Sequence, residues 1–482
     1  MTPAATALTI IGAIVVTGTA VGFLAGSRRR MDLEQWAVAG RGFGTALVFL
    51  LMAGEVYTTF AFLGLSGWAY SRGGPALYGL AYLSLAYVAS YFMLPQVWEL
   101  GRRHGIQTQP DFFDTLYRNP YLTGFVCVVG ILAFVPYIQL QLAGIGIIVS
   151  VASFGHIGRV AAMSVGTVLL VAFVFANGVR AVAWVSVVKD FLMLIAAVAI
   201  GVGIPLVHFG GIGATFAALA RARPSHLVMP GATTTLGHSW YISTVLLTAL
   251  GFYMWPHNFG VTFTAKSADT LRRNAVVLPI YSLTLSLMFF AGFAVVLILP
   301  HFRDGDLGVL TVASHTFPPW FLGVIGGAGA LTAMVPAAVL LLTAATLFAK
   351  NLYRPLFAPA MSDDSVARLA RATVVVLGAT SLALAIHGAG TLVSLLLTGY
   401  ALVAQCFPGV ALGLYWKRVS GTAVFIGMMT GMLIALLLMS LHLDPIVGLN
   451  AGFAALCGNF AVTVAASLAT RAGTAEPLPG LT

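Results

Sequence analysis

The chain has 482 residues, of which 59% are hydrophobic and only 8% are charged. Soluble domains carry roughly 25% charged residues, so this composition argues against a soluble protein and predicts one embedded in a membrane. The three cysteines all fall in apolar stretches and provide no disulfide or metal framework.

Apolar stretches of about 20 residues, the length that crosses the hydrocarbon core of a bilayer, recur along the whole chain. The sequence therefore predicts an all-α, polytopic membrane protein with about 13 transmembrane helices, forming a single transmembrane domain over residues 1–482. The predicted spans are 6–26, 43–70, 75–97, 121–150, 158–177, 181–207, 240–263, 275–300, 318–349, 367–387, 390–415, 421–441 and 447–470.

The flanking charges predict the orientation of these spans. No basic residue precedes the first apolar stretch, whereas Arg28, Arg29 and Arg30 follow it. We therefore expect this stretch to remain as a span, with the N-terminus outside and the C-terminus in the cytoplasm. Most other Lys and Arg residues then lie in inner connectors, so the net charge of +10 requires no nucleic-acid partner. We expect a bacterial inner membrane, with lipid around the protein.

Glycine and proline interrupt two of the predicted spans. The span 43–70 contains Gly54 and Glu55, and the span 240–263 contains Gly251, Pro256 and His257. The two spans are five apart, as the first helices of two five-helix repeats would be. Interrupted helices at matching positions of two halves indicate a transport site, because unwound backbone can bind ions and substrate. Glycine and proline are also common in ordinary membrane helices, which remains the alternative.

Few ionisable residues lie inside the predicted spans, and these are Glu55, Lys189, Asp190 and His257. Charges in hydrocarbon are costly and usually functional. Lys189 could serve ion coupling, form a static pair with Glu55 or Asp190, or extend towards the membrane surface. Because adjacent helical residues point about 100° apart, we expect Asp190 to contact another helix and not to share a face with Lys189.

Several short segments, in this order and spacing, resemble the sodium:solute symporter family. They are Gln107–Phe112, Ala265–Ser267, Asn351–Tyr353, Phe407–Gly409 and Gly413–Arg418. The resemblance covers residues 1–470. It implies the inverted 5+5 repeat fold of the leucine transporter, with a broken first helix in each repeat. The repeats would then be 43–207 and 240–418, with one extra span in 1–30 and two, plus a short tail, in 419–482.

Within the family, Gly54–Phe60, Tyr137–Gly144 and Met254–His257 resemble the monocarboxylate-permease branch. This resemblance implies short acids such as lactate, pyruvate, acetate and propionate as substrates. His257 is a candidate for proton exchange or carboxylate binding, against a purely structural role. The amides are equally compatible with contacts between helices, and the aromatic side chains with packing. The candidate substrate-binding residues are Glu55, Tyr57, Thr58, Thr59, Phe60, Gln139, Gln141, Trp255, His257, Asn258 and Gln405.

One departure from the family pattern concerns the coupling ion. Sodium-coupled members are expected to hold the ion between the first broken helix and a hydroxyl pair in the ninth span. Here that pair falls on Val335 and Pro336, which have no side-chain oxygen, and Thr332 takes the small position. The ammonium of Lys189 could occupy the vacated site, since a desolvated lysine can release its proton. The candidate ion-coupling residues are Lys189, Gly54, Tyr57, Thr332 and Val335.

The sequence therefore predicts a secondary active symporter that imports short monocarboxylates with protons. A sodium-coupled symporter of another small organic solute is one alternative, and a channel or uncoupled facilitator is another. We expect no enzyme activity, because neither a clustered nucleophile nor a metal-binding motif is present. We expect no cofactor or metal, with H+ favoured over Na+ as the coupling ion. The oligomeric state is left open.

Overall fold

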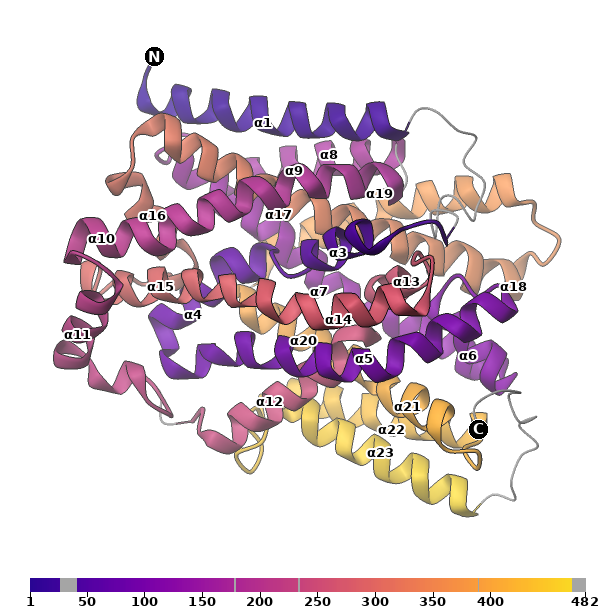
Figure 1. The fold of residues 1–482 in the computed structure, drawn as a ribbon. Coiled ribbons are helices and arrows are strands. Elements are labelled where there is room, and N and C mark those ends of the chain that lie inside the picture. Colours follow the sequence, from indigo (N-terminus) through magenta and orange to yellow (C-terminus); the bar gives the residue numbers. More distant parts are fainter. Residues whose placement is uncertain (27–40, 177–178, 233–234, 389, 470–482) are drawn as a thin grey trace.

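The computed structural model describes residues 1–26, 41–176, 179–232, 235–388 and 390–469 (Figure 1). Within these ranges the regular structure is helical, apart from two isolated β-bridges. Ten of the described helices are long and apolar enough to cross a membrane. A multi-pass helical membrane protein is thus confirmed, whereas the count of about 13 spans, the orientation and the two-repeat division stay predictions. Arg28–Arg30, on which the orientation partly rests, lie outside the described residues.

The N-terminal half of the bundle contains the first interrupted helix. Its helix α3 ends at Gly54, and the helix resumes after residues 55–58, which we call the first break. The elements are α1 (Pro3–Gly26), α3 (Thr45–Gly54), η2 (Phe60–Gly64), α4 (Leu65–Arg72), η3 (Gly74–Leu77), α5 (Tyr78–His104), α6 (Gln109–Tyr117), α7 (Pro120–Ala152), α8 (Arg159–Ala176), α9 (Val179–Val198), η4 (Ala199–Gly203), α10 (Ile204–Phe209), α11 (Ile212–Ala222) and η5 (Pro224–Leu227).

The C-terminal half contains the second interrupted helix, whose residues 252–255 we call the second break. Pro256 disfavours helical backbone at the preceding residue, Trp255, whose φ and ψ are −59° and 125°. Pro256 is itself the first residue of the next helix, a position where proline is common. The elements are α12 (His238–Gly251), η6 (Phe252–Met254), α13 (Pro256–Thr262), α14 (Ala268–Ser282), η7 (Leu283–Leu285), α15 (Ser286–Ile298), α16 (Gly305–Thr316), α17 (Pro319–Thr346), η8 (Leu347–Tyr353), α18 (Arg354–Phe357), α19 (Asp363–His387), α20 (Leu392–Val403), η9 (Ala404–Cys406), α21 (Phe407–Tyr415), α22 (Gly421–Ser440) and α23 (Ala451–Ala469).

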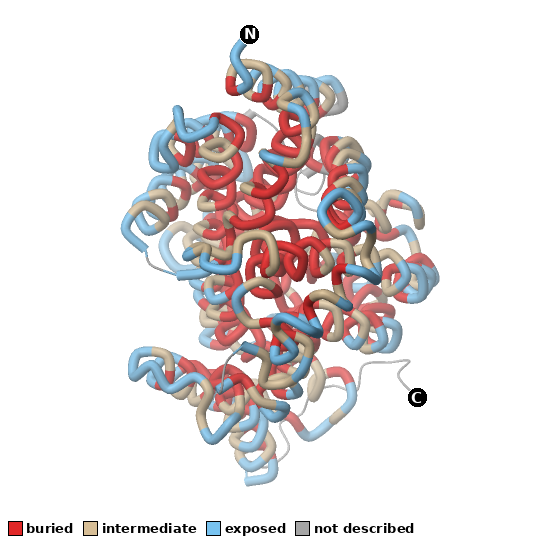
Figure 2. Tube along the Cα trace, turned by 90° about the vertical axis from the view of Figure 1, so that its left-hand side faces the viewer, coloured by how far each residue is buried: buried red, intermediate tan, exposed pale blue. Residues whose placement is uncertain are grey.

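Helix α17 lies at the centre of the bundle and packs against α1, α7 and α9. Its glycines allow this close packing: a Cβ on Gly323 would lie 2.9 Å from the backbone oxygen of Ala7, and one on Gly327 would lie 2.6 Å from Ile14. Small residues bring membrane helices together because lipid supplies little hydrophobic drive for their association. Buried residues accordingly fill the middle of the molecule, and exposed ones cover its outside (Figure 2).

The two ends of the bundle are closed by different segments. Helices α6 and α18 lie at one end, the α6 end, and α11 and α16 lie towards the other, the α16 end (Figure 1). At the α6 end, Phe43 exchanges backbone hydrogen bonds with Thr264 and Lys266, each 3.0 Å long. At the α16 end, Asp306 accepts a 3.0 Å hydrogen bond from the backbone N–H of Leu392. The two breaks lie between these closures.

Candidate transport site

The ammonium of Lys189 is bound to the first break. Lys189 projects from α9, and its side chain is 0% exposed. The ammonium donates hydrogen bonds to the backbone oxygens of Gly54 and Tyr57, the latter at 3.1 Å. These carbonyls are available because the chain leaves the helix there, so they lack the donors that a continuous helix would supply. The ammonium therefore caps the unwound backbone of the first break.

Asp190 completes the charge balance at this position. Its carboxylate forms a 3.0 Å ion pair with Lys189, and both side chains are almost fully buried. The expectation that these adjacent residues would not share a face is therefore wrong. The helical angle applies to the Cα–Cβ directions, and the long lysine side chain bends back far enough to reach its neighbour. Lys189 and Asp190 form a nearly neutral buried unit, which lowers the cost of keeping the charge in hydrocarbon.

The other two predicted ion-coupling residues lie in α17, which packs against α9. Thr332 and Val335 are both buried, at 0% and 4% exposure. The hydroxyl of Thr332 has no hydrogen-bond partner among the described residues. No hydrogen bond in the described part of the chain joins either residue to Lys189, so their ion-coupling role stays a prediction.

Glu55 and His257 bring the two breaks together. Nε2 of His257 lies 3.1 Å from a carboxylate oxygen of Glu55, and the side chains are 1% and 9% exposed. Glu55 immediately follows α3, and His257 is the second residue of α13. Aromatic rings of α7 flank the imidazole: the ring centroids of Phe134 and Tyr137 lie 5.5 and 6.0 Å away. The pair therefore combines one acid and one base at the meeting point of the two interrupted helices.

A cavity extends from this pair towards the α6 end, between α3, α13 and α17. Its volume is about 70 Å³, enough for a small solute or a few water molecules. The lining is mainly apolar, with threonine hydroxyls, the amide of Gln107 and the Glu55–His257 pair as polar groups. The lining residues are Leu51, Glu55, Gln107, Thr108, Val182, Pro256, His257, Gly260, Val261, Thr264, Val339, Leu342, Thr343, Thr346 and Leu347.

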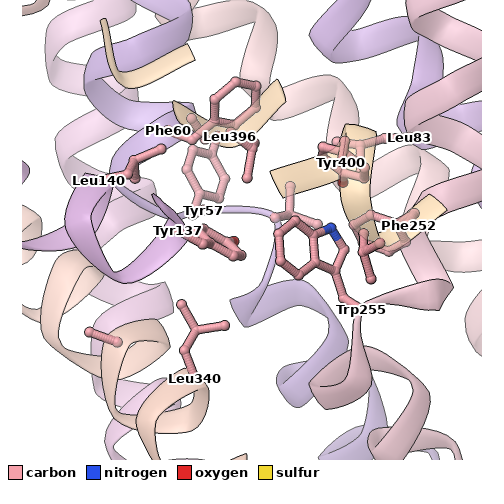
Figure 3. Close-up of a cluster of buried hydrophobic side chains, with 14 of the residues drawn as sticks. Tyr57, Phe60, Leu83, Tyr137, Leu140, Phe252, Trp255, Leu340, Leu396 and Tyr400 are labelled. Carbon is pink, nitrogen blue, oxygen red and sulfur yellow. The ribbon is translucent and has the colours of Figure 1, made fainter. Parts of the chain in front are cut away.

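The remaining candidates in the breaks are buried around this pair. Tyr57, Thr58, Thr59 and Phe60 are each at most 4% exposed, and the phenol of Tyr57 donates 2.8 Å to Thr284. Figure 3 shows Tyr57, Phe60, Tyr137 and Trp255 gathered in one aromatic cluster near the breaks. These side chains lie at the breaks, and their contacts are equally those of packing residues.

The predicted amide ligands all bond to backbone, and two of them do so at the breaks. Oε1 of Gln141 accepts a 3.3 Å hydrogen bond from the N–H of Thr59, and Asn258 donates 3.0 Å to the oxygen of Phe252. These two amides hold the first and second break, respectively. Gln139 instead donates 3.1 Å to Leu384 O in α19.

The fourth amide, Gln405, lies elsewhere in the fold. Its Oε1 accepts a 3.1 Å hydrogen bond from Asn459 of α23. Neither Gln405 nor Gln139 lines the cavity. The structure thus brings Gln141 and Asn258 to the breaks but not these two amides, whose role as ligands stays a prediction.

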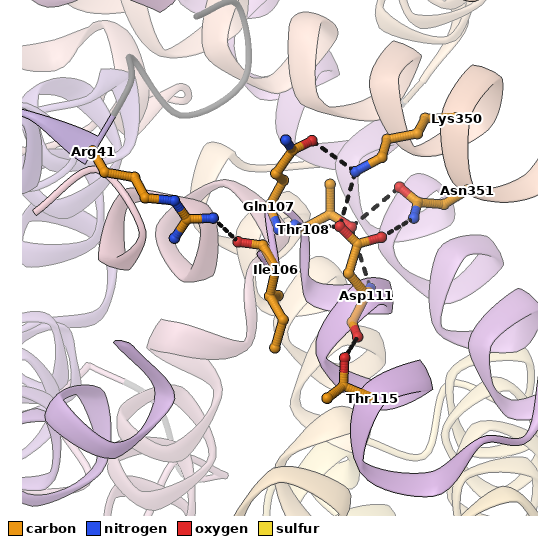
Figure 4. Close-up of polar contacts among 8 residues, drawn as sticks. All are labelled: Arg41, Ile106, Gln107, Thr108, Asp111, Thr115, Lys350 and Asn351. Atoms are coloured by element: carbon orange, nitrogen blue, oxygen red, sulfur yellow. Dashed lines mark hydrogen bonds and ion pairs between the residues drawn. The ribbon is translucent and has the colours of Figure 1, made fainter. Parts of the chain in front are cut away.

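A polar cluster at the α6 end was not predicted as functional (Figure 4). Asp111 accepts hydrogen bonds from Lys350 at 2.9 Å and from Asn351 at 2.6 Å. Burial acts to raise the pKa of Asp111, but the charge of Lys350 and these hydrogen bonds outweigh it and hold the pKa below its usual value. In the sequence, 107–112 and 351–353 served as family markers, and the polar character that the two segments share was the available signal.

Comparison with known proteins places the chain among transporters. It is 42% identical to the uncharacterized symporter YhjB of Bacillus subtilis over 96% of this chain and 97% of that protein. It is 29% identical to a monocarboxylate transport permease protein of Rhizobium johnstonii over 95% of this chain and 96% of that one.

Its fold is similar to that of a Na+-coupled sialic acid symporter solved in a substrate-bound outward-open state. The TM-score is 0.82 at 16% identity, over 98% of this chain and 99% of that one. The likeness supports the predicted leucine-transporter-like architecture without fixing the repeat layout. The sodium:solute symporter family model matches residues 36–431, and the chain belongs to the sodium:solute symporter family.

Proposed function

We propose that this protein imports short monocarboxylates together with protons, and that the ammonium of Lys189 takes the place of a coupling sodium ion. The observation that carries the proposal is the contact of this ammonium with the carbonyl oxygens of Gly54 and Tyr57. Carbonyl oxygens of unwound backbone are also the ligands that small cations use in transporters. An ammonium tethered to α9 satisfies the same oxygens without an ion from solution.

Proton release from Lys189 would change the packing at the first break. The neutral amine keeps fewer donors for the two carbonyls, and Asp190 becomes a buried carboxylate without its partner. Both effects favour a rearrangement of α3 relative to α9. Proton binding and release at Lys189 would in this way select between two arrangements of the broken helix, as the arrival and departure of an ion would.

The cavity beside His257 supports a small carboxylate as the substrate. It offers one imidazole for one carboxylate, threonine hydroxyls for a further polar group, and apolar walls for a short carbon chain. His257 in its protonated form would neutralise an anion that Glu55 alone would repel. The similarity to a monocarboxylate transport permease protein agrees with this substrate class. We place the protein in the bacterial inner membrane, with the α6 end towards the cytoplasm.

Reconstitution tests this function directly. Purified protein in liposomes would be supplied with labelled lactate, pyruvate or acetate under a pH gradient or a sodium gradient, each imposed alone. We expect accumulation of at least one acid with the inward proton gradient and without sodium. Uptake that requires sodium at constant pH would support the sodium-coupled alternative, and fluxes that never exceed equilibrium would support a facilitator.

A further inference from the structure

Helix α6 contacts both the second break and the end of α17. Gln109 is its first residue, follows the cap residue Thr108, and has a side chain that is fully buried. Its Nε2 donates a 2.8 Å hydrogen bond to the backbone oxygen of Met254, 145 residues away in the chain. Met254 ends η6 and precedes the extended residue Trp255. Gln109 therefore holds a carbonyl within the second break from outside the interrupted helix.

The same turn of α6 is fixed to η8. Asp111 binds Lys350 and Asn351, and the hydroxyl of Thr108 donates 3.2 Å to Asn351. A capping box between Thr108 and Asp111 makes the start of α6 a well-defined unit. The partner segment, η8, is a π-helix, a form often found at functional sites. Gln109 and Asp111, two residues apart in one short helix, thus bind two different segments of the bundle.

Further contacts place this unit beside the cavity. The ring of Phe112 packs edge-on against Phe259 of α13 with 5.2 Å between centroids. Thr108 forms part of the cavity wall, as do Pro256 of α13 and Leu347 of η8. A displacement of α13 relative to α17 at this end must therefore break the contacts of α6 on one side or carry α6 with it.

We propose that α6 couples the second break to the end of α17, and that Gln109 is the positioning residue of this coupling. Gln109 does not line the cavity, so it acts through Met254 and not by touching the solute. The Asp111 cluster holds the other end of the connection. The proposal requires that the protein is a transporter that changes conformation. It does not depend on which solute or coupling ion the protein carries.

Cysteine labelling in the cavity tests this coupling without any substrate. Thr343 lines the cavity from α17, and Cys457 is the exposed native cysteine. In the full-length protein carrying Cys457→Ser and Thr343→Cys, the labelling rate with a maleimide reports how often the cavity opens. We expect Gln109→Leu and Lys350→Met each to raise this rate about fivefold or more, the range of ordinary conformational coupling.

The double variant decides whether the two contacts act together. If α6 connects them, releasing either end already uncouples the break, so the double variant should label no faster than the faster single variant. Asp114→Asn, on the same helix but at a carboxylate that accepts its hydrogen bond from Thr123, is the matched control and should combine additively with Gln109→Leu. An additive result for Gln109→Leu with Lys350→Met, or an unchanged rate in Gln109→Leu, would overturn the proposal.

Gln109→Glu separates positioning from simple loss of folding. A protonated glutamate still donates to Met254, whereas an ionised one does not. The measured quantity is the ratio of the labelling rate of this variant to that of the Gln109 parent at the same pH. This ratio should be close to one in acid and should rise as the pH increases. Melting curves of this variant at each pH, showing that it stays folded, separate this profile from unfolding caused by the buried carboxylate. A pH-independent ratio would contradict the role of the Met254 hydrogen bond.

Discussion

Nε2 of His257 lies 3.1 Å from a carboxylate oxygen of Glu55, and this contact joins two interrupted helices whose residues are 202 positions apart in the chain. Both residues form part of the wall of the cavity that reaches the α6 end. In the proposed function, a solute carboxylate that enters this cavity would meet the imidazole together with its acidic partner. Substrate binding and the relative position of the two breaks would therefore be linked at one contact.

His257→Ala should weaken binding of a short carboxylate by tenfold or more, because about 1.4 kcal/mol of lost interaction already corresponds to a factor of ten. Equilibrium binding of labelled lactate to the purified protein measures this loss. Gln96→Ala is the control, since that amide donates to Tyr415 and does not line the cavity. Equal losses in the two variants would show that the imidazole has no special role in binding.

Asp306 should make the stability of the protein depend on pH at the α16 end. Burial raises the pKa of its carboxyl to about 7, despite the hydrogen bond from the N–H of Leu392. The folded pKa lies above the unfolded one, so the folded state binds the extra proton and stability falls as pH rises between the two values.

Asp306→Asn keeps an acceptor for Leu392 and cannot ionise. The melting temperature of the wild type should therefore fall relative to this variant between pH 5 and about pH 7. Above that pH the two curves should run parallel. Melting curves in detergent at a series of pH values provide the measurement. Curves that stay parallel from pH 5 to pH 7 would show that Asp306 ionises as an exposed carboxyl does.

Gly144 permits the close contact of α7 with the first break. A Cβ at this position would overlap the side chain of Thr59, whose N–H is held by Gln141 of the same helix. Gly144→Ala should therefore destabilise the protein by about 1–3 kcal/mol, the usual cost of overpacking. Gly124→Ala, also in α7, meets its nearest atom only at 4.0 Å and should be neutral or slightly stabilising. Similar thermal stabilities for the two variants would contradict this packing.

The sequence alone located the two breaks and the side chains that meet there. Glycine and proline mark where helical hydrogen bonding stops, and a charge in an apolar span stands out because its burial is costly. Glu55, His257 and Lys189 could therefore be singled out without a structure. The contact of Lys189 with the first break agrees with its predicted place, and its pairing with Asp190 was one of the alternatives left open. The expectation that the two residues would not share a face neglected the length of the lysine side chain.

The role of Gln109 could not be predicted in the same way. Its partner is a backbone oxygen, and every residue has one, so no residue type in the sequence identifies Met254 as an acceptor. The position of α6 also depends on a connector between spans, where apolar periodicity gives no information on direction. Gln405 is a different case: a buried amide in an apolar span is compatible with a ligand and with a contact between helices, and the structure places it beside Asn459 on a neighbouring helix.

Removing the charge of Lys189 should separate solute exchange from accumulation. Lys189→Ala and Lys189→Gln both lack the ammonium that binds Gly54 and Tyr57, while the cavity at His257 remains. We expect lactate exchange to persist and gradient-driven accumulation to be lost in both variants. Loss of folding in both would instead indicate a static pair with Asp190, because breaking a buried ion pair costs about 3–5 kcal/mol.

The most direct test of proton coupling through Lys189 is to follow the pH inside sodium-free liposomes while lactate is added outside. With the wild-type protein, lactate should acidify the lumen. Liposomes without protein provide the baseline. With Lys189→Gln, lactate should still exchange but should move no protons. Acidification by Lys189→Gln equal to the wild type, or wild-type lactate uptake that needs sodium and moves no protons, would contradict the role assigned to Lys189.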